Sequence, residues 1–170
     1  MILETDRLIL RPIDPAKDFD AFADCYSDAD TMRYLTGSAM TPAQAWRSMA
    51  MVIGHEAFRG YTFLSCIEKS TGAWVGRVGP WFPMGWPQPE IGWVIHPDHR
   101  RKGFAREAGR ACIDYAYETL GWDEVVHCIL DGNIGSMKTA ESLGSKRLYS
   151  MDGIPGLTEE LCWVYGQSRP

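Results

Sequence analysis

The sequence has no long apolar run and no leader-like start. None of its hydrophobic stretches approaches the roughly 20 residues that cross a bilayer, and the opening MILETDRLILRP lacks the basic and continuous apolar regions of a signal peptide. With 17 Lys and Arg against 22 Asp and Glu, the chain has a net charge of −5. This acidic balance does not favour nucleic acid or an anionic membrane as a partner. We expect a soluble, cytoplasmic protein that binds neither.

Metal-binding and disulfide patterns are also missing. The five cysteines are an odd number scattered through apolar segments, with no CxxC pair and no clustering with the four histidines. We therefore expect reduced thiols in the core and no metal site.

Length and composition predict one domain. At 170 residues, of which 45% are hydrophobic, the chain is long enough to bury one core and too short for two full domains. Neither a repeat nor a low-complexity linker divides it, so we expect a single domain over residues 1–170.

Apolar periodicity, helix caps and turn residues predict the order β-α-α-β-β-β-α-β-α-β-β. This order indicates an α/β fold of the α+β sandwich type, with a mixed, mostly antiparallel sheet of about six to seven strands flanked by helices. The strongest helix start is Thr41-Pro42-Ala43-Gln44, which combines an N-cap, a proline at the first helical position and a capping box. The predicted strands are 7–12, 61–68, 73–79, 91–95, 124–130, 146–151 and 157–165, and the predicted helices are 18–26, 42–58, 104–120 and 134–143.

The stretch from Glu90 to Tyr117 organises the rest of the chain. An apolar strand ending at Ile95 leads into the turn His99-Arg100-Arg101-Lys102, and Gly103-Phe104-Ala105 opens a long helix. Unpaired N–H groups and the helix dipole favour an anion at such a start, and adjacent cations repel one another unless an anion lies among them. We expect a pyrophosphate there. A Rossmann fingerprint does not fit, because its further glycine is absent, and a Walker A loop does not fit, because Gly-Lys-Ser/Thr is absent.

Two motifs resemble the GCN5-related N-acetyltransferase (GNAT) superfamily. The segment Arg100 to Ala105 fits the pattern Q/R-x-x-G-x-G/A of that family, after a strand that reads EIGWVIHPDH. Downstream, Asn133-Ile134-Gly135-Ser136 followed by Leu143-Gly144 is similar to the N-x-x-S…LG signature. The opening LETDRLILRP looks like the ribosomal-protein alanine/serine N-terminal acetyltransferase branch. The resemblance covers nearly the whole chain in matching order.

The resemblance implies acetyl-CoA as the acetyl donor, with its pyrophosphate at the basic turn. Its pantetheine arm is expected in a splay between the fourth and fifth strands, beside the backbone of Val94 and Ile95. Asn133 is expected to cap its helix or bind the pantetheine amides, and Lys138 either reaches the phosphates or is solvated surface. The expected cofactor-binding residues are Val94, Ile95, Arg100, Arg101, Lys102, Gly103, Phe104, Ala105, Arg106, Asn133, Ser136 and Lys138.

Acyl transfer to an amine needs a base, a stabilised oxyanion and a group that meets the departing thiolate. Glu90 is the candidate base, because it begins the central strand two positions before Gly92 on the same face. The alternatives are a cross-strand charge partner for Glu90 and a water chain as the base. Many family members place a Tyr for the thiolate where this chain has Ala140. Ser136 is then the candidate thiolate contact, and its alternative role is to satisfy N–H groups in the first helical turn.

The acceptor is expected to be a primary amine, either an α-amine of a protein or peptide or a small-molecule amine. The aromatic and proline-rich segment 80–87 is either a loop folded on its own core or a lip over the acceptor site. The expected activity is direct transfer in a ternary complex, by a monomer or homodimer. The alternative is a non-catalytic acyl-CoA-binding or sensor module on the same fold.

Overall fold

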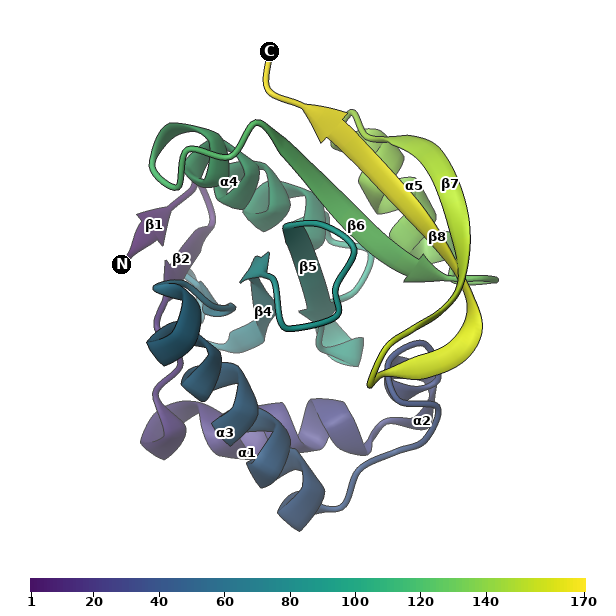
Figure 1. Ribbon diagram of the computed structural model, residues 1–170. Helices are drawn as coiled ribbons and strands as arrows, with labels where there is room; N and C mark the ends of the chain where they lie inside the picture. Colours follow the sequence, from purple (N-terminus) through teal and green to yellow (C-terminus); the bar gives the residue numbers. More distant parts are fainter.

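The computed structural model describes residues 1–170 and is built around an eight-stranded sheet (Figure 1). Its strand order is β1-β2-β3-β4-β5-β6-β8-β7, and every neighbouring pair is antiparallel except β5 and β6. The mixed, mostly antiparallel sheet was predicted, and the short β1 adds a strand to the predicted number. The strands are β1 Leu3–Glu4, β2 Leu8–Arg11, β3 Leu64–Glu68, β4 Trp74–Trp81, β5 Glu90–Ile95, β6 Glu124–Leu130, β7 Lys146–Ile154 and β8 Thr158–Ser168.

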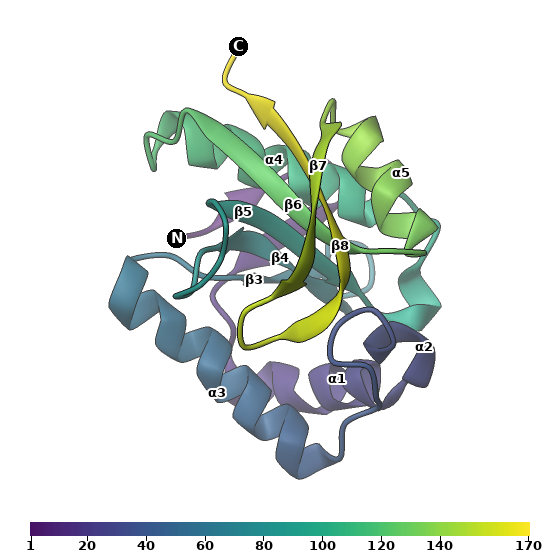
Figure 2. The same cartoon turned by 45° about the vertical axis from the view of Figure 1, so that its right-hand side comes forward.

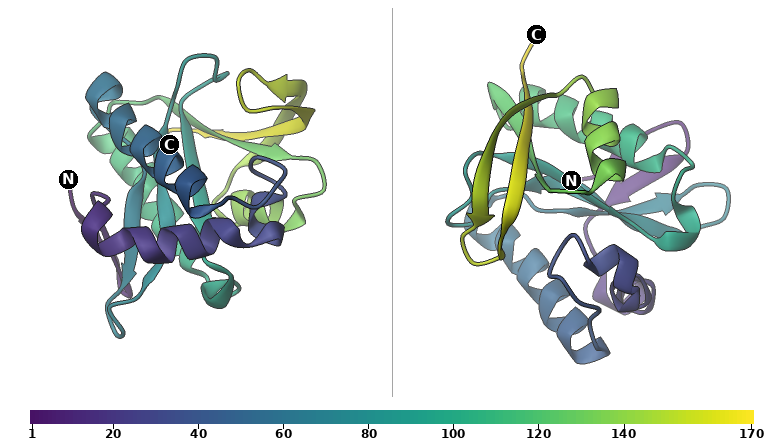
Figure 3. Two further views of the ribbon diagram at one scale, coloured as in Figure 1. Left: turned by 90° about the horizontal axis from the view of Figure 1, so that it is seen from below. Right: turned by 90° about the vertical axis from the view of Figure 1, so that its right-hand side faces the viewer.

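Helices cover both faces of the sheet (Figures 2 and 3). One layer holds α1, α2 and α3, and the other holds α4 and α5. None of them combines the length and the apolar character needed to span a bilayer. The helices are α1 Pro15–Ser27, α2 Ala29–Met32, α3 Pro42–Arg59, α4 Phe104–Glu118 and α5 Ile134–Ser142, with a 3₁₀ turn at Pro97–His99.

Local sequence signals explain most of the helix boundaries. The predicted capping box is present, because Thr41 accepts from the Gln44 N–H and Gln44 accepts from the Thr41 N–H. The helix ends at Gly60, which has the left-handed φ of 78° that glycine tolerates best. The first helix begins earlier than predicted, because Asp14 caps it and Pro15 occupies its first turn.

The sheet extends further than predicted at the aromatic segment. Pro80 and Trp81 were expected in an irregular loop, but they belong to β4 and lie opposite Ile91 and Glu90. That part of the prediction was wrong, because the proline sits near the end of its strand, where a missing N–H costs little pairing. Only the remainder of the segment forms a loop.

The parallel neighbours β5 and β6 pair at one point and then separate. Their only register pair is Glu90 with Val126, whose N–H donates to the Pro89 carbonyl at 3.0 Å. Beyond it, the imidazole of His127 spans the gap, with Nδ1 2.6 Å from the Ile91 carbonyl oxygen and Nε2 2.9 Å from Ser145 Oγ. Burial lowers the pKa of His127 to about 4, so the ring that holds the strands apart is neutral. The predicted splay therefore lies between β5 and β6.

A buried carboxylate fastens α1 to the sheet. Asp18 is 1% exposed and accepts from both Nη atoms of Arg11 at 2.8 and 2.6 Å and from Ser65 Oγ at 2.7 Å. The Asp14 N–H donates to it at 2.9 Å. Burial would raise the pKa of Asp18, but these hydrogen bonds and the charge of Arg11 hold it below its ordinary value.

We expect Asp18→Asn to lower the free energy of unfolding by about 3 kcal/mol at neutral pH, because it leaves Arg11 without its charge partner. The pKa of Asp18 is lowered, so its contribution is complete above its ordinary pKa and disappears as pH falls through the folded-state value. Urea unfolding at pH 7 and in acid measures both effects. The matched control is Asp20→Asn, an exposed position on the same helix. An equal stability loss in the two variants at pH 7 would contradict the prediction.

Candidate active site

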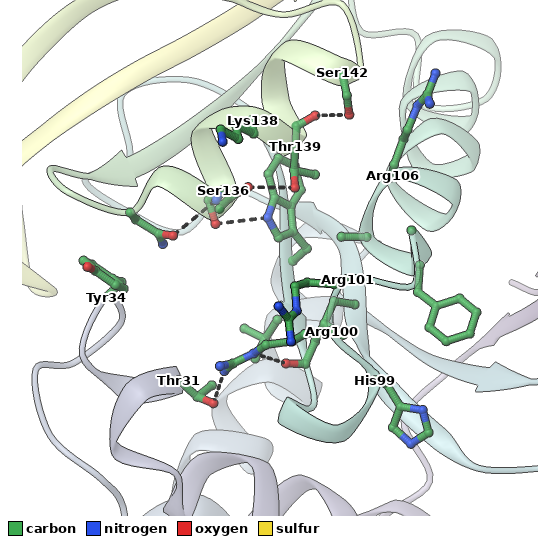
Figure 4. Close-up of a pocket in the computed structure, with 18 of the residues that line it drawn as sticks. Thr31, Tyr34, His99, Arg100, Arg101, Arg106, Ser136, Lys138, Thr139 and Ser142 are labelled. Carbon is green, nitrogen blue, oxygen red and sulfur yellow. Dashed lines mark hydrogen bonds between the residues drawn. The ribbon is translucent and has the colours of Figure 1, made fainter.

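A cavity of about 560 Å³ opens at the N-terminus of α4 (Figure 4). Its walls come from α2 and the loop after it, the end of β5, the basic turn and the exposed face of α5. Figure 4 shows Ser136, Lys138 and Thr139 of α5 across the cavity from Arg100 and Arg101. The lining residues are Asp30, Thr31, Tyr34, Leu35, Trp93, Val94, Ile95, His99, Arg100, Arg101, Gly103, Phe104, Ala105, Arg106, Asn133, Gly135, Ser136, Lys138, Thr139 and Ser142.

The start of α4 presents unused backbone donors to this cavity. None of the N–H groups from Arg101 to Arg106 donates to an acceptor within the protein, and no side chain caps the helix. Gly103 has a φ of 83° and Arg101 a φ of 60°, so the turn coils tightly into the helix. Successive N–H groups at a helix N-terminus form an anion-binding concavity. The arrangement therefore suits a pyrophosphate.

The basic side chains of the turn are used in different ways. Arg100 donates to the Thr31 hydroxyl and to the Ile95 carbonyl, and its Nη2 lies 3.5 Å from an Asp28 oxygen, so it fastens α2 to the end of β5. Arg101, Arg106 and Lys138 line the cavity without such a partner. Lys102 does not line it.

A second cavity of about 320 Å³ lies on the other side of the splay, between α1–α3 and the β7–β8 hairpin. Aromatic and aliphatic side chains form most of its walls, and Arg77 and Glu90 are its charged members. The rings of Phe63, Trp81 and His55 follow one another, with centroids 4.9 and 4.2 Å apart. The two cavities share Tyr34, Leu35, Trp93, Val94, Asn133 and Ser136.

Glu90 lies in the second cavity, where the splay begins. It is 7% exposed; its Oε1 accepts from the Cys128 N–H at 3.1 Å, and its Oε2 accepts from the Trp86 indole N–H. Burial raises the pKa of Glu90 to about 7, against the opposing effects of these two donors and of the Arg77 charge. A carboxyl group with this pKa exchanges protons readily near neutral pH.

Ser136 lies where the two cavities meet. Its N–H donates to Asn133 Oδ1 at 3.2 Å, and its hydroxyl oxygen accepts from the Trp93 indole N–H at 3.3 Å. Since the oxygen is already an acceptor, the hydroxyl proton is left to donate to a group in the cavity. Ala140 is fully buried against Ile129 and Tyr165 and lines neither cavity. Ser136 is therefore the α5 hydroxyl that reaches both.

The family is decided by a match that spans most of the chain. Residues 7–146 match the model described as an acetyltransferase (GNAT) domain. The chain belongs to the GNAT acetyltransferase family. Acetyl transfer is the activity of this family, and acetyl-CoA is the donor that its members use.

Individual GNAT relatives agree with this assignment. The uncharacterized N-acetyltransferase YnaD of Bacillus subtilis is 25% identical over 147 residues, which are 86% of this chain and 84% of the relative. The crystal structure of an acetyltransferase from Agrobacterium tumefaciens superposes with a TM-score of 0.84 at 27% identity, over 99% of this chain and 95% of the other. A ribosomal-protein alanine acetyltransferase from Vibrio fischeri, at 14% identity and a TM-score of 0.74 over 99% and 96% of the two chains, shares the fold.

Several residues that line the two cavities have no sequence signal of their own. Arg77 is a single cation inside an apolar strand, and His127 has the pattern of a core histidine. Thr31 and Tyr34 lie in a segment without periodicity, and only the fold brings them to the first cavity. Trp86 belongs to the segment with two open interpretations. Trp81 is buried in the core and Trp86 packs against it, and both line the second cavity. The lip over an acceptor stays a prediction.

We expect the carboxyl group of Glu90 to titrate near pH 7. The Trp86 indole donates to the ionised form, so Trp86→Phe removes a stabilising hydrogen bond and raises the pKa further. Carbonyl chemical shifts of ¹³C-labelled glutamate, assigned with Glu90→Gln, measure both values. Trp46→Phe changes an exposed tryptophan on α3 and is the control that leaves the titration unchanged. An ordinary pKa for Glu90, or a lower pKa in Trp86→Phe than in the unmodified protein, would contradict this prediction.

Proposed function

We propose that the protein transfers the acetyl group of acetyl-CoA to a primary amine by direct transfer in a ternary complex. The observation that carries the proposal is the pair of cavities joined at Ser136, one at the unpaired N–H groups of α4 and the other containing Glu90. A donor and an acceptor can each occupy one cavity and meet at the splay. We infer that the residues at that meeting point carry the reaction.

The first cavity would hold acetyl-CoA. The N–H groups from Arg101 to Arg106 would bind its pyrophosphate, with the side chains of Arg101, Arg106 and Lys138 adding positive charge. Val94 and Ile95 would contact the pantetheine arm at the edge of β5, which has no strand partner on the side of the splay beyond Glu90. When bound, acetyl-CoA supplies a thioester whose acetyl carbon is the electrophile.

Glu90 would be the base. In the reaction the amine nitrogen bonds the acetyl carbon, the carbon–sulfur bond breaks, and the amine gives one proton to the carboxylate. A pKa of about 7 places Glu90 where it is both ionised in part and basic enough to accept that proton. Ser136 would donate its free hydroxyl proton in a hydrogen bond to the departing sulfur, since a neutral serine is a poor acid and a good donor.

The one thiol that lines the cavity with Glu90 supports direct transfer over an acetylated cysteine. Cys128 lines the second cavity, but its contact with Cys162 and its burial raise the pKa of its thiol. A thiol that stays protonated is a weak nucleophile. No base in the cavity is hydrogen-bonded to it.

Acetyl-CoA binding tests the donor half of the proposal. We expect saturable binding in calorimetry, and we expect Arg101→Gln to weaken it roughly tenfold through the loss of a charge-assisted contact. Lys102→Gln is the matched control, because it removes the same charge from the next residue, which does not line the cavity. An absence of binding at millimolar acetyl-CoA would end the proposal. Equal losses of affinity in the two variants would mean that the effect comes from the overall positive charge of the turn and not from a contact in the cavity.

Turnover tests the base. We expect Glu90→Gln to lower kcat by about 10²–10³-fold and to abolish the rise in rate as pH increases through about 7, where the carboxyl group loses its proton. Glu124→Gln, at the exposed start of the next strand, is the control. Amide formation over a panel of amines and peptide N-termini, followed by mass spectrometry, measures the rates. An unchanged rate in Glu90→Gln would mean that a water chain, and not Glu90, acts as the base. Binding of acetyl-CoA without turnover of any amine would favour the acyl-CoA sensor.

A further inference from the structure

Arg77 is a buried cation in the wall of the second cavity. It lies in the middle of β4 and is 9% exposed. Its register partner is Val94, and Trp81 on the same strand is paired with Glu90. Positions that differ by an even number on a strand share a face, so Arg77 and Glu90 point to the same side of the sheet. Both line the same cavity.

The guanidinium of Arg77 has no anionic partner. Its Nε donates to the Tyr26 hydroxyl, and its central carbon lies 3.8 Å from the centroid of the Phe63 ring. Neither Nη atom donates to an acceptor in the protein, and Nη1 is fully buried. Both oxygens of Glu90, the other charged group of the cavity, are occupied by the donors from Trp86 and Cys128.

An unpaired buried charge is costly, and a ligand of opposite charge would offset that cost. Stacking on Phe63 and the bond to Tyr26 fix the plane of the guanidinium, so its two unpartnered Nη groups form an oriented fork. Nη1 is closed to solvent, so a ligand that uses both arms must displace a neighbouring side chain. Such a fork matches the two oxygens of a carboxylate. His127, the remaining basic side chain of the cavity, is kept neutral by burial, so a single positive charge faces the ligand. A singly charged carboxylate balances it better than a phosphate does.

We propose that Arg77 binds the carboxylate of the acceptor, and that the acceptor is a small amino carboxylate with an apolar body. This inference rests on the proposed acetyl transfer, because it assumes that the second cavity receives the amine. Phe63, Trp81 and Trp86 provide apolar walls between the fork and Glu90. The volume of about 320 Å³ suits a small molecule.

Matched pairs of amines test the proposal with the full-length protein and acetyl-CoA. The amino carboxylates are phenylalanine, leucine and methionine, and each is paired with the amine that lacks its carboxylate: phenethylamine, isopentylamine and 3-(methylthio)propylamine. Leucinamide, a C-terminally amidated peptide and O-phosphoethanolamine complete the set. We expect at least one amino carboxylate to exceed its matched amine by about tenfold or more in kcat/KM, the value of a charge-assisted pair.

Variants assign that preference to Arg77. Arg77→Met conserves much of the volume and is expected to lower the kcat/KM ratio of the preferred amino carboxylate to its matched amine about tenfold or more. The ratio is the readout because the loss of the Arg77 charge also raises the pKa of Glu90, which affects both amines alike. Arg77→Lys keeps the charge without the fork, so its preference for the amino carboxylate is expected to lie between those of the unmodified protein and Arg77→Met. Arg47→Met, at an exposed position of α3, is the control. Thermal unfolding and acetyl-CoA affinity show whether each variant is folded.

Equilibrium binding separates this inference from the proposed function. Titration of the same amino carboxylates into the protein, followed by tryptophan fluorescence, requires no turnover. Binding that Arg77→Met abolishes, without acetylation of any amine, supports the Arg77 site and counts against acetyl transfer. A different result overturns the Arg77 inference and leaves acetyl transfer in place. In that result, matched amines, amides or amidated peptides are acetylated as fast as amino carboxylates, and Arg77→Met does not change the relative rates. A preference for O-phosphoethanolamine, or no binding of any amino carboxylate, also overturns it.

Discussion

The single point of pairing between β5 and β6 is the constraint on which the site depends. Parallel neighbours would normally continue as a ladder, but here side chains replace the ladder: Glu90 accepts from the Cys128 N–H, and His127 contacts the Ile91 carbonyl. The strands stay in one sheet while their other ends separate. The separation leaves an unpaired strand edge beside the start of α4, and it joins the two cavities at Ser136. A continuous ladder would close both the edge and the junction.

The two buried carboxyl groups, Asp18 and Glu90, have opposite effects on stability. Asp18 has donors on both oxygens and a paired arginine, so its ionised form favours the folded state. Glu90 has the opposite effect. Because its pKa is raised to about 7, the folded protein holds that proton more tightly than the unfolded chain, and stability falls between the ordinary pKa and about pH 7. This shift corresponds to a cost of about 3 kcal/mol, and the proposed role of Glu90 as the base would make it an exchange of stability for activity.

Sequence reasoning predicted the parts of the structure that neighbouring residues determine. The capping box at Thr41, the strand 124–130 and the turn before Gly103 depend on local geometry, and each lies where it was expected. The predicted donor-site residues come from two such segments, and all but Lys102 line one cavity. The extension of β4 through Pro80 and Trp81 was missed, because strand pairing with residues 90–91 outweighs the local preference of a proline-rich segment. The sequence did not single out Arg77. What distinguishes this residue is that it has no anionic partner in the folded protein, and the spacing of residues along the chain does not reveal that.

The contrast between the two cavities explains why membership of a family leaves the acceptor open. The first cavity, where we propose that acetyl-CoA binds, relies on backbone N–H groups and a strand edge, which any sequence with the right turn can present, so its motif can be recognised. The second cavity, where we propose that the acceptor binds, is built from side chains far apart in the chain, such as Tyr26, Arg77 and Trp86. The packing of α1 and α3 on the sheet and the hydrogen bonds from Arg77 to Tyr26 and from Trp86 to Glu90 bring them together. A change at one of them alters the charge or shape offered to the acceptor without disturbing the donor turn. The proposed acceptor site therefore depends on tertiary contacts, and Arg77, the cation that those contacts leave unpaired, is the most specific chemical feature among them.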